Sequence, residues 1–275
     1  MAIFGIGTET YLYINGLVVN DEIKISEHET LMPTQCKLPL DTVSQNIKSD
    51  TDFAITILCA NTIASQLRIT AETPKDLAVR AWNSQWDIIL LSAILKCDAF
   101  CNLQCTHPLG MISESSVLEV TNYHMRGLIE TPYLVTKDDA DWIEHNFANA
   151  KSLLGNNPFS TAVHSMATYR WHSMPRIQLA ILWTGIEALF DVSNELNFRI
   201  SLHVSKFLAN DNLDEMKKTF DDTKNLYKAR SSAVHGSNIR GDSNSLVDKS
   251  ASILNKLIKK CISINSLPNV NELIF

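Results

Sequence analysis

The chain has 275 residues, of which 45% are apolar and 20% charged, as in ordinary globular proteins. This length fits one large domain or two modest ones, and the apolar content excludes wholesale disorder. The net charge of −6 is spread unevenly. Residues 214–260 carry ten basic and six acidic side chains, a balance of +4, whereas the remainder has a balance of −10. Such asymmetry fits a local polyanion site, and equally the solvated surface of helices.

The N-terminal segment MAIFGIGTETYLYING lacks the basic region, apolar stretch and cleavage site of a secretory signal. The longest apolar run, residues 88–95, is far shorter than the roughly 20 residues of a membrane span. We therefore expect a cytoplasmic protein without a membrane partner. Its six cysteines are expected to be free thiols.

The first 70 residues or so are predicted to be rich in β-structure. Residues 10–19 contain many β-branched and aromatic side chains, with Asn15-Gly16 as a possible hairpin turn. The continuous apolar run at 53–60 is typical of a buried strand.

A long helix is predicted next, from about Lys75 to about Leu95. Thr73 is suited to be its N-cap and Pro74 its first residue. From 97 to 123 the pattern weakens, which indicates loops and a short strand near 117–120.

After Pro132 the pattern becomes helical throughout. The apolar periodicity predicts helices at 138–154, 159–171, 176–190, 198–208, 213–234 and 246–264. The third of these is apolar nearly all round, as expected of a central core helix. The predicted fold class is α+β, with a β-rich mixed module at 1–134 and an all-α bundle at 135–275.

The segment that most strongly suggests a catalytic site is RSSAVHG, in which Arg230 precedes His235 by five residues. On an uninterrupted helix these side chains would lie about 140° apart. Gly236 is expected to end the helix, so that His235 lies at its end, where the chain can bend toward Arg230. The alternative is a helix terminus whose Arg and His only favour the negative end of its dipole.

An arginine beside a histidine suits cleavage of an RNA phosphodiester by its own 2′-hydroxyl. Histidine can exchange a proton near neutral pH, as general base or acid. Arginine can hold the phosphate with a bidentate pair of N–H groups. Ser231 could add a hydrogen bond, and no metal or cofactor is required.

Three segments, WTGIEALF (183–190), NFRISLHVSKFL (197–208) and LYKARSSAVHG (226–236), resemble the HEPN superfamily, and more narrowly its Apea-like domains. The resemblance covers roughly residues 140–265. The hallmark of the superfamily is an Arg, four to six residues and a His; here four residues intervene.

The resemblance implies that Arg230 and His235 are catalytic and that Ser231 is the polar residue that often follows the Arg. Glu187 and Arg199 match recurring positions and are expected to support the site, with Glu187 pairing with Arg230 or Arg199, or else lying on an exposed stripe. It further implies a homodimer with both motifs at one cleft, RNA as the substrate, and an inhibitory or activating partner. The expected function is that of a metal-independent endoribonuclease, which would act in bacterial anti-phage defence or as a toxin.

Two other interpretations remain open. Some members of the family only dimerise or sense nucleic acid, with the motif intact. Alternatively, Cys97, Cys101 and Cys105 would form one stripe if they lay on a helix and, with His107, could bind zinc; the other interpretation is that they are buried apolar thiols. No Walker loop, dinucleotide fingerprint, zinc-protease motif or serine elbow is present.

Overall fold

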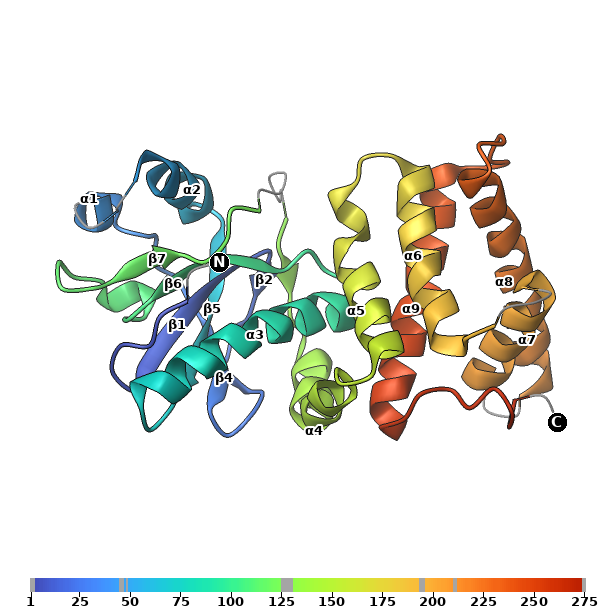
Figure 1. Cartoon of the computed structure of the whole chain (residues 1–275), viewed down its shortest axis with the longest axis horizontal. Coiled ribbons are helices and arrows are strands. Elements are labelled where there is room, and N and C mark those ends of the chain that lie inside the picture. The colour runs from blue at the N-terminus through green and yellow to red at the C-terminus, as the bar shows by residue number, and fades with distance from the viewer. Residues whose placement is uncertain are drawn as a thin grey trace. The chain divides into compact units, whose positions relative to one another are not determined.

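The computed structural model describes residues 3–44, 47, 49–124, 131–192, 196–209 and 212–273. Two compact units divide the chain, Met1–Ala148 and Asn149–Phe275. The first contains an antiparallel sheet with helices, and the described residues of the second form helices without a strand (Figure 1). The predicted α+β class is therefore confirmed.

The first unit is built on a six-stranded sheet of order β3-β4-β5-β1-β6-β7, in which every neighbouring pair is antiparallel. Its strands are β1 (Glu9–Asn15), β3 (Ile23–Lys24), β4 (Glu29–Pro33), β5 (Ile63–Thr70), β6 (Phe100–Cys105) and β7 (Leu118–Val120). Strands β2 (Leu17–Val18) and β8 (Tyr133–Leu134) form a separate parallel pair.

Helices cover both faces of the central strand β1, whose residues from Thr10 to Asn15 are all buried. Tyr11 and Tyr13 pack in a cluster with Ile55 and Cys59 of α2 (Asp50–Ala60) and with Val43 of the short helix α1 (Leu40–Val43). The long helix α3 (Pro74–Leu95) contacts β1, β5 and β6. Successive side chains of a strand point to opposite faces, so burial on both sides requires a layer of helix on each.

Helix α3 begins as the sequence predicted. The side chain of Thr73 accepts a hydrogen bond from the N–H of Asp76, and Pro74 is the first helical residue. Its C-terminus is Leu95, followed by Lys96 in the left-handed conformation.

The prediction of a strand at 53–60 was wrong, because this segment lies within α2. A short apolar run has no periodicity that separates a buried strand from a buried helix. The local signal for a helix lies just before it: Ser49 is the N-cap and accepts a hydrogen bond from the N–H of Asp52.

The Asn15-Gly16 hairpin was also wrong. Gly16 does have a positive φ of 77°, but β2 leaves the sheet and pairs with β8 instead of folding back on β1. The segment 97–123, predicted to be mostly loops, contains the whole of β6. Its Asn102 and Gln104 are buried polar residues, so the strand lacks the apolar pattern by which a buried strand is recognised. The predicted short strand near 117–120 is confirmed as β7.

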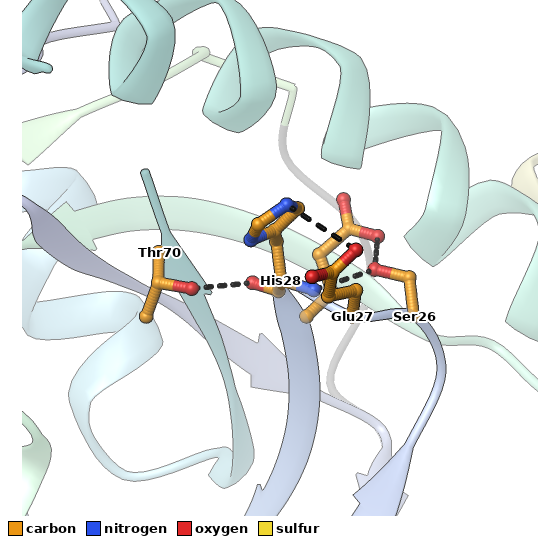
Figure 2. A network of polar contacts seen from close by, with 5 residues as sticks. Ser26, Glu27, His28 and Thr70 are labelled. Carbon is orange, nitrogen blue, oxygen red and sulfur yellow. Dashed lines mark hydrogen bonds and ion pairs between the residues drawn. The ribbon is translucent and has the colours of Figure 1, made fainter. Parts of the chain in front are cut away.

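A polar network fixes the turn between β3 and β4 (Figure 2). The buried carboxylate of Glu29 accepts hydrogen bonds from the hydroxyls of Ser26 (2.6 Å) and of Ser84 on α3 (2.8 Å). The carbonyl of His28 accepts one from the N–H of Thr70 (2.9 Å) on β5. The turn is therefore tied both to its neighbouring strand and to α3. The 3.9 Å contact between His28 and the exposed Glu27 adds little, as is usual for surface pairs.

The second unit is a bundle centred on α6 (Pro175–Phe190), which packs against α5, α8 and α9. The other helices are α5 (Asn157–Thr168), the 3₁₀ turn η3 (Tyr169–Trp171), α7 (Leu196–Ala209), α8 (Leu213–Val234) and α9 (Ser243–Ile264). Helix α4 (Lys137–Leu153) crosses the division between the units. All six predicted helices are present, with ends displaced by at most a few residues.

Helix α6 buries one side rather than its whole circumference. Leu179, Leu182, Trp183 and Ile186 are fully buried, whereas Ile177 is 39% exposed and Thr184 is also exposed. The prediction of a central core helix is therefore confirmed, since α6 packs against α5, α8 and α9, although apolar composition alone did not show which side would stay exposed.

Gly185 allows α6 to approach two of its neighbours, α5 and α9, closely. A Cβ atom there would lie 2.9 Å from the Cβ of Ser165 on α5 and 3.0 Å from Leu254 Cδ2 on α9. Gly185→Ala should thus lower the free energy of unfolding by about 1–3 kcal/mol through overpacking, although alanine favours helices. Urea unfolding would measure this change. Gly155→Ala is the control, since only the Ser152 carbonyl, at 3.9 Å, would approach its Cβ; equal stability of both variants would contradict the close packing.

His203 of α7 should make stability depend on pH. Its ring is 1% exposed, neither ring nitrogen has a hydrogen-bond partner among the described residues, and it stacks on Phe190. Burial lowers the pKa of His203 below 6.5, with Arg199 and Lys206 contributing. Its contribution to stability is therefore full above pH 6.5 and is lost as the pH falls below that value.

Unfolding measured between pH 7.5 and 5 should show wild-type stability falling more steeply than that of His203→Leu, by at most about 1.4 kcal/mol per pH unit. Parallel curves for the two proteins would show that His203 is not held in its neutral form.

Candidate functional site

The candidate site lies where α8 ends. Helix α8 begins at an Asn212 cap and ends at His235, whose N–H donates to the carbonyl of Ser231 (3.0 Å). Gly236 follows with a φ of 75°, a conformation that glycine adopts without strain. The sequence prediction that Gly236 ends the helix and leaves His235 at its end is confirmed.

Arg230, just over one turn before this end, is held by an ion pair with Glu187 of α6. Its Nη2 atom lies 2.9 Å from each of the two carboxylate oxygens. The side chains of Arg230 and Glu187 are only 19% and 23% exposed, so water screens the pair less than it screens a surface pair. Of the two partners that the sequence suggested for Glu187, the structure assigns Arg230.

Aromatic side chains support this ion pair from within the bundle. The guanidinium carbon of Arg230 lies 5.5 Å from the ring centre of Tyr227, one turn earlier on α8. Tyr227 makes an edge contact with Trp183 of α6, with ring centres 5.2 Å apart. The indole N–H of Trp183 donates to Ser250 of α9 (3.2 Å). Three helices thus fix the position of Arg230.

Burial and pairing oppose each other at Glu187. Burial raises its pKa, Arg230 lowers it, and the net direction is upward. The pKa of Tyr227 is also raised, first by burial and then by the charge of Glu187. The Nε atom of Arg230 is buried and has no acceptor among the described residues. Arg230 therefore keeps donor capacity that Glu187 does not use.

His235 has different surroundings from Arg230. It is exposed, and no hydrogen bond or ion pair joins its ring to any residue that the structure describes. Ser231 is half-buried, and its carbonyl accepts the N–H of His235. The structure thus provides a fixed cation and an exposed imidazole near one helix end, without a direct bond between them.

Arg176, in the first turn of α6, is a residue that the sequence analysis missed. Its Nη1 approaches the carbonyl of Ala233 (3.5 Å) and its Nη2 that of Ser237 (3.4 Å). These two carbonyls lie on either side of His235 in the chain. Two antiparallel helices bring Arg176 here, since α6 begins at the end of the bundle where α8 stops (Figure 1). No local sequence signal identifies such a long-range contact.

Arg199 does not join this group. It is half-buried on α7, and neither a hydrogen bond nor an ion pair links it to Glu187 or Arg230 among the described residues. Its electrostatic effect falls on His203 instead. The prediction that Arg199 supports the site therefore has no contact behind it.

The three cysteines do not form a helical stripe, and all three are buried free thiols, as the alternative interpretation expected. Cys101 and Cys105 lie on β6, and Cys97 follows the end of α3. Burial raises the pKa of Cys101 to about 12, and it also raises that of Cys105. His107 Nδ1 is within hydrogen-bond distance of the hydroxyls of Thr106 and Ser116. Among the described residues, no three His, Cys, Asp or Glu side chains are grouped so as to hold a metal.

A separate groove of about 1050 Å³ lies between α8 and α9. Its walls mix acidic and basic side chains, among them Glu215, Asp222, Lys249 and Lys256. Neither Arg230 nor His235 lines it, so this groove and the end of α8 are distinct features.

The comparisons with known proteins do not assign a family: no family model, curated protein or solved structure matches this chain. None of the helices in the described residues is both long and apolar enough to cross a membrane.

The Glu187–Arg230 pair should cost stability when only one partner is removed. Glu187→Ala leaves a largely buried guanidinium without its counter-charge, and the free energy of unfolding should fall by about 1–3 kcal/mol. Replacing both residues, as Glu187→Leu with Arg230→Met, should restore most of that loss because two desolvated charges disappear together.

Urea unfolding of wild type, Glu187→Leu, Arg230→Met and the double variant would measure this coupling. Additive losses in the double variant would show that the two side chains do not interact in solution.

Proposed function

We propose that this chain is a metal-independent endoribonuclease of HEPN type, with Arg230 and His235 as its catalytic residues. Arg230 would hold the scissile phosphate and stabilise the charge that develops on it. His235 would exchange protons with the reacting hydroxyl groups. Ser231, one residue after Arg230, would add a hydrogen bond to the phosphate.

The reaction is an internal transfer of the phosphoryl group. The ribose 2′-oxygen bonds to phosphorus and loses its proton to a base, while the bond from phosphorus to the 5′-oxygen of the next nucleotide breaks. The departing 5′-oxygen takes up a proton. The products are a 2′,3′-cyclic phosphate and a 5′-hydroxyl, and no water, metal or oxidant is consumed.

The observation that carries this proposal is the contrast between Arg230 and His235. Arg230 is held by Glu187 and Tyr227 with its side chain still 19% exposed, while His235 is exposed at the helix end. A cation that does not need to reorganise stabilises developing charge more effectively than a mobile one. An exposed histidine can reach a substrate hydroxyl.

We further propose that the protein works as a homodimer in the cytoplasm, with the two Arg/His pairs at one cleft and an inhibitory or activating partner controlling it. The exposed side of α6, which includes Ile177 and Thr184, is a surface on which such pairing could occur. RNA is the proposed substrate, in a role in bacterial anti-phage defence or as a toxin.

A second candidate function is a HEPN module that dimerises or senses nucleic acid without cutting it. The ion pair favours this alternative, because Glu187 already occupies one nitrogen of Arg230. In that case Arg230 serves the packing of α6 on α8, and His235 has no catalytic role.

Cleavage of labelled single-stranded RNA in EDTA separates the two functions. We expect the wild-type protein to cut and to leave 2′,3′-cyclic phosphate ends. His235→Ala should slow cleavage by about 10²–10⁴-fold, as expected when a proton-transferring group is lost. Arg230→Ala should have a similar effect. The readout is the rate of product formation and the chemistry of the ends.

His145→Ala is the matched control, because His145 is also an exposed histidine but lies on α4. It should cut at the wild-type rate. Cleavage that persists when Arg230 and His235 are both replaced would place the chemistry elsewhere, and RNA binding without any cleavage would favour the second function.

A further inference from the structure

The end of the bundle that holds His235 also presents the segment between α5 and α6. This segment contains η3 (Tyr169–Trp171) and runs to Pro175, the first residue of α6. Hydrogen bonds from Arg176 to Ala233 and Ser237 join it to the end of α8. In Figure 1 the α5–α6 and α8–α9 connections lie at the same end of the second unit.

Trp171 of this segment and Arg176 in the first turn of α6 have the chemistry that a single nucleic-acid strand requires. Trp171 is 42% exposed, although it also makes an edge contact with His164 at 6.4 Å between ring centres. Aromatic faces of this kind stack on bases without regard to sequence. Arg176 supplies a permanent positive charge and five N–H donors.

Arg176 is placed differently from Arg230 with respect to His235. Its guanidinium contacts the main chain on both sides of His235, whereas Nη2 of Arg230 is directed at Glu187. The contacts of Arg176 are 3.4 and 3.5 Å long, at the weak limit for hydrogen bonds. Anionic phosphate oxygens form stronger bonds with guanidinium than neutral carbonyls do, so a phosphate can replace these contacts.

We propose that Arg176 and Trp171 bind the RNA strand beside His235, with Arg176 on a backbone phosphate and Trp171 stacked on a base. This inference rests on the proposed function, because it takes RNA as the ligand of this end of the bundle. It assigns strand binding to two residues outside the Arg/His motif. The ligand class is single-stranded RNA, because a base must be unpaired for its face to stack on Trp171.

The test is binding of a fluorescent single-stranded RNA oligonucleotide in which every 2′-hydroxyl is replaced by hydrogen or methoxy, so that it cannot be cut. Fluorescence anisotropy on the full-length protein would give Kd at several salt concentrations. Trp171→Ala should weaken binding about 5- to 100-fold with little change in salt dependence, because stacking is not ionic. Trp171→Phe should keep most of the affinity.

Arg176→Gln should weaken binding about tenfold and reduce the slope of log Kd against log salt by about 0.7, the value for one phosphate contact on a single strand. Arg176→Lys should retain the slope, since the charge remains. The comparison with Arg176→Lys separates lost charge from a disturbed end of α8, and circular dichroism would show whether the total helix content is unchanged.

Matched controls are Trp82→Ala, a tryptophan 50% exposed on α3, and Arg199→Gln on α7. Both should bind like wild type. Equal affinity of Trp171→Ala, Arg176→Gln and these controls, or no binding by wild type, would overturn the inference. If binding depends on Trp171 and Arg176 but natural RNA is not cut, the binding surface stands and the proposed nuclease activity fails.

Discussion

The ion pair between Glu187 and Arg230 is the interaction that connects the candidate site to the core helix of the second unit. Both side chains are largely removed from water, so neither charge is tolerated there without the other. The pair joins the middle helix of the bundle to the helix that carries His235. Each of the two helices also contributes an arginine that contacts the other helix. Arg230 of α8 pairs with Glu187 of α6, and Arg176 of α6 contacts the carbonyls at the end of α8.

These two arginine contacts explain how a bundle with an apolar core carries a group of polar side chains at one end. The fixed guanidinium is supported by Tyr227, which makes an edge contact with Trp183; both aromatic residues are part of the core. The exposed histidine lies where the helix stops and its last carbonyls need partners. The same few turns of α6 and α8 therefore hold Arg230 in a fixed position and leave His235 accessible to solvent.

The sequence was sufficient to predict the structure where a local signal and its structural effect lie within a few residues of each other. Thr73-Pro74 marks the start of α3, and Gly236 marks the end of α8 because a positive φ suits glycine. It was insufficient where burial is decided by distant partners. Strand β6 looks polar, yet Gln104 donates to the carbonyl of Phe4 and to the hydroxyl of Thr10, contacts nearly 100 residues away.

The candidate site shows the same difference between features set by local sequence and features set by distant contacts. The end of α8 at His235 was predictable because helix termination is local, and Glu187 was recognised as a charge that needs a partner. The choice of Arg230 over Arg199 was not predictable, because it depends on how α6, α7 and α8 pack. Arg176 was missed for the same reason: its two carbonyl partners lie about 60 residues along the chain and only tertiary structure brings them to it.

Helix α4 has a practical consequence for dissecting the protein. The division between the units falls at Ala148, inside this helix. Beyond that point α4 is anchored to α9, since Asn149 donates to the carbonyl of Ile262. Its first turn is closed by reciprocal hydrogen bonds between Thr136 and Asp139. A shortened protein that keeps α4 intact should therefore start ahead of Thr136, because truncation at Ala148 would remove most of this helix together with its capping residues.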